Sequence, residues 1–174
     1  ITTGGKINRY TREDAAGAAE SWAAWFGQKQ ADLQGTAVFG DTSMAAAVKK
    51  DTNAIGYNNS LYVFDNYTGE IYPGLDVIPI DINGNGKIDA DEDIYKDLAT
   101  FLEAVQAGKF PSPPARDLYF ITKGRTQKPE VAAFFKWVLT DGQKLVHANG
   151  YVPLKTAELQ QFVKKVNPDV SYGY

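Results

Sequence analysis

Segments typical of β-strands alternate with segments typical of helices along this chain, and this alternation constrains the fold more than any other feature. The chain opens with a loosely alternating stretch at 6–10, a polar turn at 11–14 and an alanine-rich helical segment that ends at Gly27. Further β structure is expected at 37–39, 53–57, 62–65, 77–80 and 117–122, and further helices at 43–50, 94–107, 129–139 and 157–166. Because helical crossovers join strands that run parallel, the pattern predicts an α/β fold with a mixed, mainly parallel sheet flanked by helices.

A proline cluster divides the chain into two stretches. Pro111, Pro113 and Pro114 fit neither a helix nor a central strand, so they predict a stiff extended connection. It leads directly into the strand expected at 117–122. The aromatic tail that ends at Tyr174 is expected to be poorly ordered.

Composition excludes several classes of function. The chain has 18 Lys and Arg against 21 Asp and Glu, a formal charge of -3, which leaves no basic excess for a nucleic acid or an anionic membrane. It has no cysteine and a single histidine, His147, so thiolate chemistry and multi-histidine metal centres are excluded. No apolar run of about 18 residues occurs, so no transmembrane segment is expected.

The first helix carries a cluster of aromatic residues. Asp14 stands where an N-cap is expected, and Gly27 closes the helix. Trp22, Trp25 and Phe26 share a face at helical spacing, which favours core packing over a sugar-binding platform.

A twelve-residue segment at 81–92 matches the calcium-loop pattern at its diagnostic positions. The hard oxygen ligands that Ca²⁺ needs would come from the side chains of Asp81, Asn83 and Asn85, the carbonyl of Lys87, and the side chains of Asp89 and Glu92. Gly86 permits the sharp turn at position six. The alternative is an acidic surface turn that binds nothing.

The surroundings of this loop favour a structural role for the calcium. A calcium sensor pairs two helix–loop–helix units and opens a methionine-rich groove, whereas a strand is expected before this loop and Met44 is the only methionine. The sequence therefore predicts a lone calcium clip that joins a strand to a helix.

The turn at 12–18 has the chemistry of an oxyanion site. The start of a helix presents unpaired N–H groups and a positive dipole end, Gly17 permits close approach, and Arg12 adds a two-pronged donor. Asp14 can accept a proton from a protonated phosphate and so reject fully ionised sulfate. The alternative is that Asp14 is only a helix cap and Arg12 its solvent-exposed partner.

These residues resemble a known family. The run Arg-Glu-Asp-Ala-Ala-Gly-Ala at 12–18 resembles the Arg-x-Asp-x-Ser-Gly-Thr signature of the phosphate-binding proteins of ABC transporters, the PstS-like group of type 2 periplasmic binding proteins. The segments at 53–57 and 150–154 are similar to two further motifs of that family, in the family's order. The loop at 81–92 resembles an insertion of a bacterial subgroup.

The resemblance implies two α/β lobes that clamp the anion between them. Residues 1–116 would then be a second-lobe-like domain that includes the calcium-type loop. Residues 117–174 would contain the crossing strand and the helices that return toward the first lobe, and a missing N-terminal lobe would be a partner.

The resemblance also implies a ligand set. Arg12 and Asp14 would bind the anion through their side chains, and Ala16, Gly17 and Ala18 through their backbone N–H groups. Ala16 and Ala18 stand where the family has Ser and Thr. Each missing hydroxyl removes a hydrogen bond to a charged ligand, on the order of 1.5 to 3 kcal/mol.

The resemblance implies a periplasmic or extracytoplasmic solute-binding protein that passes phosphate or a related oxyanion to an ABC permease. Anchoring to a membrane through a region outside this chain fits that setting. The alternative is a calcium-stabilised interaction or scaffold module that kept the fold and lost the ligand. An enzyme is not expected, because the serines lack a nucleophile-elbow motif and His147 is expected at a surface turn.

Overall fold

The computed structural model describes residues 5–124 and 128–166, and the aromatic tail predicted after Val166 lies outside them. The chain divides into two compact units, Ile1–Arg116 and Asp117–Tyr174. The assignment of these units to the two lobes of a binding protein stays a prediction. Within the described part of the chain, no helix combines the length and the apolar character that a bilayer crossing requires.

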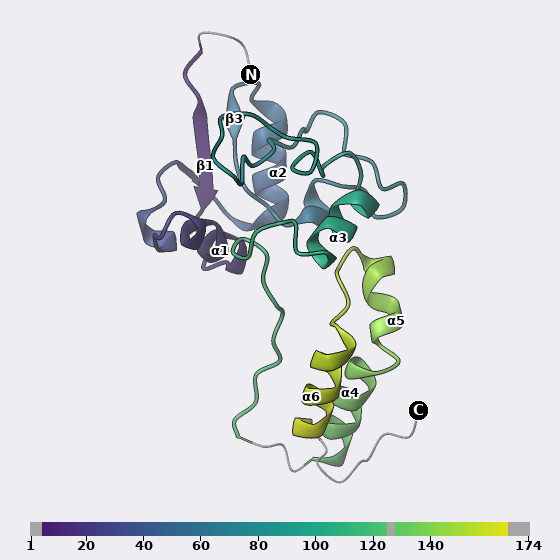
Figure 1. Cartoon of the computed structure of the whole chain (residues 1–174). Coiled ribbons are helices and arrows are strands. Elements are labelled where there is room, and N and C mark those ends of the chain that lie inside the picture. The colour runs from purple at the N-terminus through teal and green to yellow at the C-terminus, as the bar shows by residue number, and fades with distance from the viewer. Residues whose placement is uncertain (1–4, 125–127, 167–174) are drawn as a thin grey trace. The chain divides into compact units, whose positions relative to one another are not determined.

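The first unit is built on a small parallel sheet (Figure 1). The strands are β1 (Asn8–Arg12), β2 (Thr36–Val38) and β3 (Ala54–Ile55), in the order β2-β1-β3. β1 pairs in parallel with both neighbours, with Tyr10 opposite Thr36 and Asn8 opposite Ala54. The predicted α/β class is confirmed.

Helix α2 (Gly40–Lys50) connects β2 to β3 and packs against all three strands. Its Met44 is fully buried. A Cβ atom at Gly56, just after β3, would lie 2.7 Å from Met44 Sδ and 2.9 Å from Val48 Cγ2, so only glycine lets this backbone approach the helix so closely.

Helix α1 (Gly17–Trp25) corrects two expectations. Its N-cap is Ala16 and not Asp14, whose carboxylate is engaged elsewhere. The helix fully buries Ala19 and Ala23, whereas Trp22 and Trp25 are half-buried and Phe26, just after the helix, is 54% exposed. The ring of Trp22 stacks on the ring of Tyr57, with 6.2 Å between their centroids.

The rest of the first unit contains an apolar cluster around α3 (Leu98–Gln106). Two short 3₁₀ turns precede it in the chain: η1 (Gln30–Asp32) lies between α1 and β2, and η2 (Ser60–Tyr62) lies between β3 and α3. Helix α3 begins four residues later than predicted, because Asp97 caps it by accepting from the N–H of Thr100. The cluster consists of buried Ile94, Tyr95 and Ala104, with Val77, Phe101 and Phe110 against them.

Two predictions in this region are wrong in detail. The residues at 77–80 form no strand, and the chain at 62–65 contributes only an antiparallel bridge between Phe64 and Ile71. The proline cluster is a turn and not a stiff extended connection, since the N–H of Ala115 donates to the carbonyl of Pro111 at 3.0 Å and Ser112 Oγ donates to the carbonyl of Ala115 at 2.8 Å.

The second unit is helical in its described residues. It contains α4 (Pro129–Leu139), α5 (Gln143–Val146), the 3₁₀ turn η3 (His147–Asn149) and α6 (Thr156–Val166), and α4 packs against α6 (Figure 1). The helices predicted at 129–139 and 157–166 are confirmed. His147 is exposed, as expected of a surface turn.

The strand predicted at 117–122 does not form. Leu118 is 70% exposed and Ile121 is 93% exposed, and no strand among the described residues pairs with this segment. Phe120 nevertheless contacts the rings of Phe134 and Phe135 in α4. A strand needs a partner for its N–H and C=O groups, and its apolar composition alone does not supply one.

Candidate functional site

Polar residues collect at the carboxyl ends of the three parallel strands. Arg12 ends β1, Asp41 lies in the first turn of α2 after β2, and Tyr57 and Asn59 follow β3. In open α/β sheets this edge is the usual position of a ligand site. The sheet therefore brings together residues that are far apart in the sequence.

The Arg12 side chain is held by two carboxylates. It is 8% exposed. Its Nε and Nη2 donate to the two oxygens of Asp14 at 2.9 and 2.6 Å, and its Nη1 donates to Asp41 Oδ1 at 2.8 Å. The hydrogen bond to Asp14 raises the pKa of Arg12. The alternative interpretation, in which Arg12 is exposed to solvent, is therefore wrong. The positive charge of Arg12 is paired with two negative charges.

Asp14 links the start of α2 to this pair. Its Oδ1 accepts from the N–H of Gly40, the first residue of α2, at 3.0 Å. The bond from Arg12, followed by the bond from Gly40, holds the pKa of the Asp14 carboxyl well below its usual range. Asp14 is thus ionised at neutral pH and can only accept further hydrogen bonds.

The depressed pKa of Asp14 predicts an acid-sensitive contribution to stability. A carboxyl with a lowered pKa in the folded state stabilises the fold above its unfolded pKa, 3.8, and this contribution is lost as the pH falls below that value. Asp14→Asn should therefore flatten the fall of the melting temperature between about pH 4 and pH 2, as measured by circular dichroism. An unchanged acid profile would show that Asp14 does not contribute in this way.

The N–H groups at the start of α1 differ in their partners. That of Ala16 donates to Gln30 Oε1 at 3.1 Å, while Gln30 Nε2 donates to the Asp14 carbonyl at 2.7 Å. Within the described chain, the N–H groups of Gly17 and Ala18 have no acceptor. Two of the three predicted backbone donors are therefore free for a ligand.

A second arginine, which the sequence interpretation missed, lies against this helix end. A Cβ atom at Gly17 would lie 3.0 Å from both Nε and Nη2 of Arg116. Gly17 thus makes room for an arginine side chain. Arg116 follows the proline turn directly, and no motif marks it.

The loop at 81–92 is closed by its own hydrogen bonds. Asp81 accepts from the N–H groups of Gly84, Asn85 and Gly86. Glu92 is 3% exposed and accepts from the N–H groups of Ile82, Asn83 and Asp89. Gly86 has φ 80°, the left-handed conformation that position six requires.

The other predicted ligands lie on the same loop. Asn83 Nδ2 and Asn85 Nδ2 both donate to Asp89 Oδ2, at 2.9 and 2.7 Å, and the N–H of Lys87 donates to Asn85 Oδ1. Over 5–124 and 128–166, no three acidic or histidine side chains converge as a ready metal centre. A cation would therefore also need the amide oxygens, and both amides would have to turn toward it.

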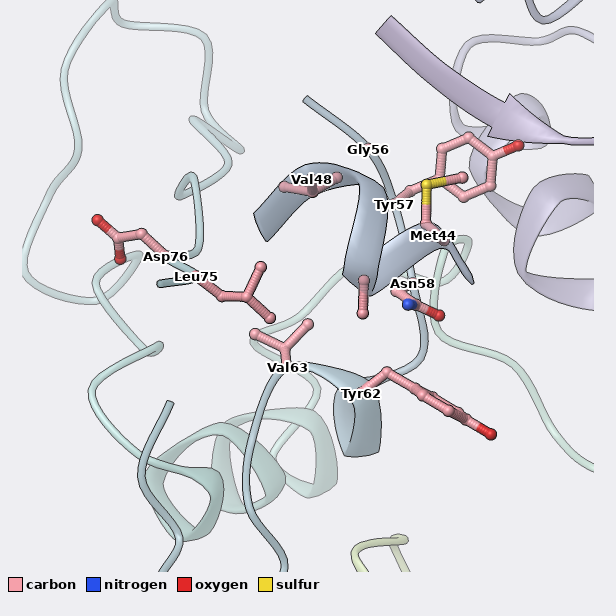
Figure 2. A pocket seen from close by; sticks show the side chains of 10 residues that line it. Met44, Val48, Gly56, Tyr57, Asn58, Tyr62, Val63, Leu75 and Asp76 are labelled. Carbon is pink, nitrogen blue, oxygen red and sulfur yellow. The ribbon is translucent and has the colours of Figure 1, made fainter. Parts of the chain in front are cut away.

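A small pocket of about 60 Å³ lies beside α2 (Figure 2). Met44 and Val48 line it from the helix, and Val63 and Leu75 point into it from the following segments. Ligand pockets usually enclose about 300 Å³ or more, so this one is too small for most solutes.

Comparison with known proteins gives distant relatives. Two proteins named phosphate-binding protein PstS 2, from Streptococcus agalactiae serotype V and serotype III, are each 27% identical over 168 residues, which is 90% of this chain and 49% of the relative. This chain spans about half the length of the curated relatives it matches. No family model and no solved structure matches it.

Proposed function

We propose that this chain is part of an extracytoplasmic solute-binding protein that binds inorganic phosphate or a similar oxyanion for ABC import. The observation that carries the proposal is the free pair of N–H groups, on Gly17 and Ala18, at the start of α1. A helix start of this kind favours an anion. The distant similarity to proteins named for phosphate binding supports it.

The carboxylate of Asp14, which belongs to the same turn as these donors, favours a protonated anion. Asp14 is ionised and presents only acceptors, so it repels an oxyanion unless that anion carries a proton to donate. Phosphate carries one at neutral pH, whereas sulfate does not. Capture needs no chemical step, since closure of a second lobe over the anion would remove water from it.

A calorimetric titration in phosphate-free buffer tests this function. Phosphate should give saturable heat, and sulfate at the same ionic strength should give none. The absence of saturable heat with phosphate would contradict the proposed capture of phosphate by this chain. Equal binding of both anions would contradict the role of Asp14 in selecting a protonated ligand.

We propose calcium as a structural cofactor of the 81–92 loop. The support is the loop's conformation, in which the side chains at positions one and twelve accept three backbone N–H groups each. The cation would bind between the side chains of Asn83, Asn85 and Asp89, where the two amide groups now donate hydrogen bonds to Asp89. It would tie the segment before α3 to that helix.

A scaffold module that has lost anion binding is the second candidate. The absent hydroxyls at Ala16 and Ala18, and the engagement of the Ala16 N–H by Gln30, favour it. An ABC permease and a missing N-terminal lobe are the partners of the first candidate. Membrane anchoring through a region outside this chain fits the same candidate.

A further inference from the structure

The guanidinium of Arg116 lies at the start of a helix and forms only long hydrogen bonds within the described part of the chain. It packs on Gly17 in the first turn of α1, where the helix dipole is positive. Its two hydrogen bonds are long, 3.4 Å from Nη1 to Ser21 Oγ and 3.5 Å from Nη2 to Asn59 Oδ1. Among the residues that the structure describes, no carboxylate forms a salt bridge with it.

The other arginine of the site cannot supply free positive charge. Arg12 is paired with both Asp14 and Asp41, so these three side chains together carry one net negative charge. An anion that approaches the free N–H groups of Gly17 and Ala18 would meet this net charge at the same edge of the sheet. A second cation nearby would offset it.

We propose that Arg116 is the residue whose free charge holds the oxyanion at the start of α1, with Arg12 positioning Asp14. This assignment rests on the proposed function. The side chain has donors to spare, because a guanidinium carries five N–H groups and only two are used here, both at long distance. It would provide bonds to the anion that the alanines at 16 and 18 cannot make through a hydroxyl group.

Asn59 connects Arg116 to the rest of the site. Its Oδ1 accepts from Arg116, and its Nδ2 donates to Asp41 Oδ1 at 3.1 Å. Asp41 in turn pairs with Arg12. The two arginines are thus linked through one amide and one carboxylate, and all of these residues belong to the first compact unit.

The test compares Arg116→Gln with Arg9→Gln, a matched change at an exposed arginine of β1. Phosphate affinity by calorimetry should fall at least about tenfold in Arg116→Gln, as expected when charged hydrogen bonds are lost, and should stay within about twofold in Arg9→Gln. Without phosphate, the melting temperature of Arg116→Gln should stay within about 2 °C of that of the wild type, because Arg116 is exposed and its hydrogen bonds are long. The positive helix end and the net negative charge of the Arg12 pair also act on its charge in opposite directions.

The possible outcomes separate this assignment from the proposed function. A wild-type chain that shows no saturable phosphate binding overturns both. Wild-type binding that survives in Arg116→Gln overturns the assignment alone. A large fall in the melting temperature of Arg116→Gln without phosphate also overturns it, because Arg116 would then be a structural residue.

Discussion

Replacing Arg12 with alanine should lower the melting temperature by about 5–10 °C, because two half-buried carboxylates then lose the buried cation that pairs with both of them. Asp14 and Asp41 would face each other with no positive charge between them. Breaking a buried ion pair from one side leaves uncompensated charge, which costs far more stability than losing a surface pair. Phosphate binding should be lost as well, since Asp14 would no longer be held in place.

Two further variants make this result specific. Arg9→Ala removes an exposed arginine from the same strand and should change the melting temperature by no more than about 2 °C. Adding Asp41→Asn to Arg12→Ala should recover part of the lost stability by removing one of the two repelling carboxylates. Equal melting temperatures for Arg9→Ala and Arg12→Ala would show that the buried network does not stabilise the fold.

Calcium should raise the melting temperature of the metal-free chain by several degrees. At about 10 mM calcium, roughly 100 times a Kd of about 10⁻⁴ M, binding to the folded state alone would add about 2.7 kcal/mol. EDTA should reverse the shift. Differential scanning calorimetry with and without calcium measures it, and a melting temperature indifferent to both reagents would defeat the calcium proposal.

Glu92→Gln and Asp91→Asn form a matched pair for this experiment. Each removes one negative charge, but Glu92 is buried at position twelve of the loop, whereas Asp91 is exposed and outside the ligand pattern. Glu92→Gln should abolish the calcium-induced shift, and Asp91→Asn should keep it. The comparison uses the calcium-induced shift and not the melting temperature itself. In Glu92→Gln the side-chain amide would also face the N–H of Asp89, which would lower stability even without metal.

Local patterns predicted the elements that depend on local interactions. The helices at 129–139 and 157–166 follow from apolar spacing, and the α/β class follows from the alternation of element types. The strands expected at 77–80 and 117–122 failed because a strand exists only with a partner, which its own residues do not reveal. The burial of Ala19 and Ala23 in α1, while Phe26 is exposed, depends equally on the rest of the fold, which helical spacing does not reveal.

The candidate site likewise combines residues that a local motif reveals with residues that only the fold brings together. Arg12, Asp14 and Gly17 lie within one short motif, and the structure pairs Arg12 with Asp14 at the sheet edge. Asp41, Gln30 and Arg116 come from three other segments and carry no motif of their own. Their contacts change the roles of the motif residues: Arg12 becomes a paired charge, and Gly17 becomes a contact for an arginine.

The order of strands in the sheet has a consequence for folding kinetics. β1 is central yet comes first in the chain, so both of its pairings are parallel contacts with strands that lie well after it in the sequence. Non-local parallel pairing is slow, since the entropy of closing each connection is lost before the pairing is gained. Arg12 contacts Asp41 only once α2 has packed beside β1, and the contact between Arg116 and Gly17 closes a much longer loop than any strand pairing does. The proposed anion site therefore requires more of the fold to be assembled than the sheet itself does.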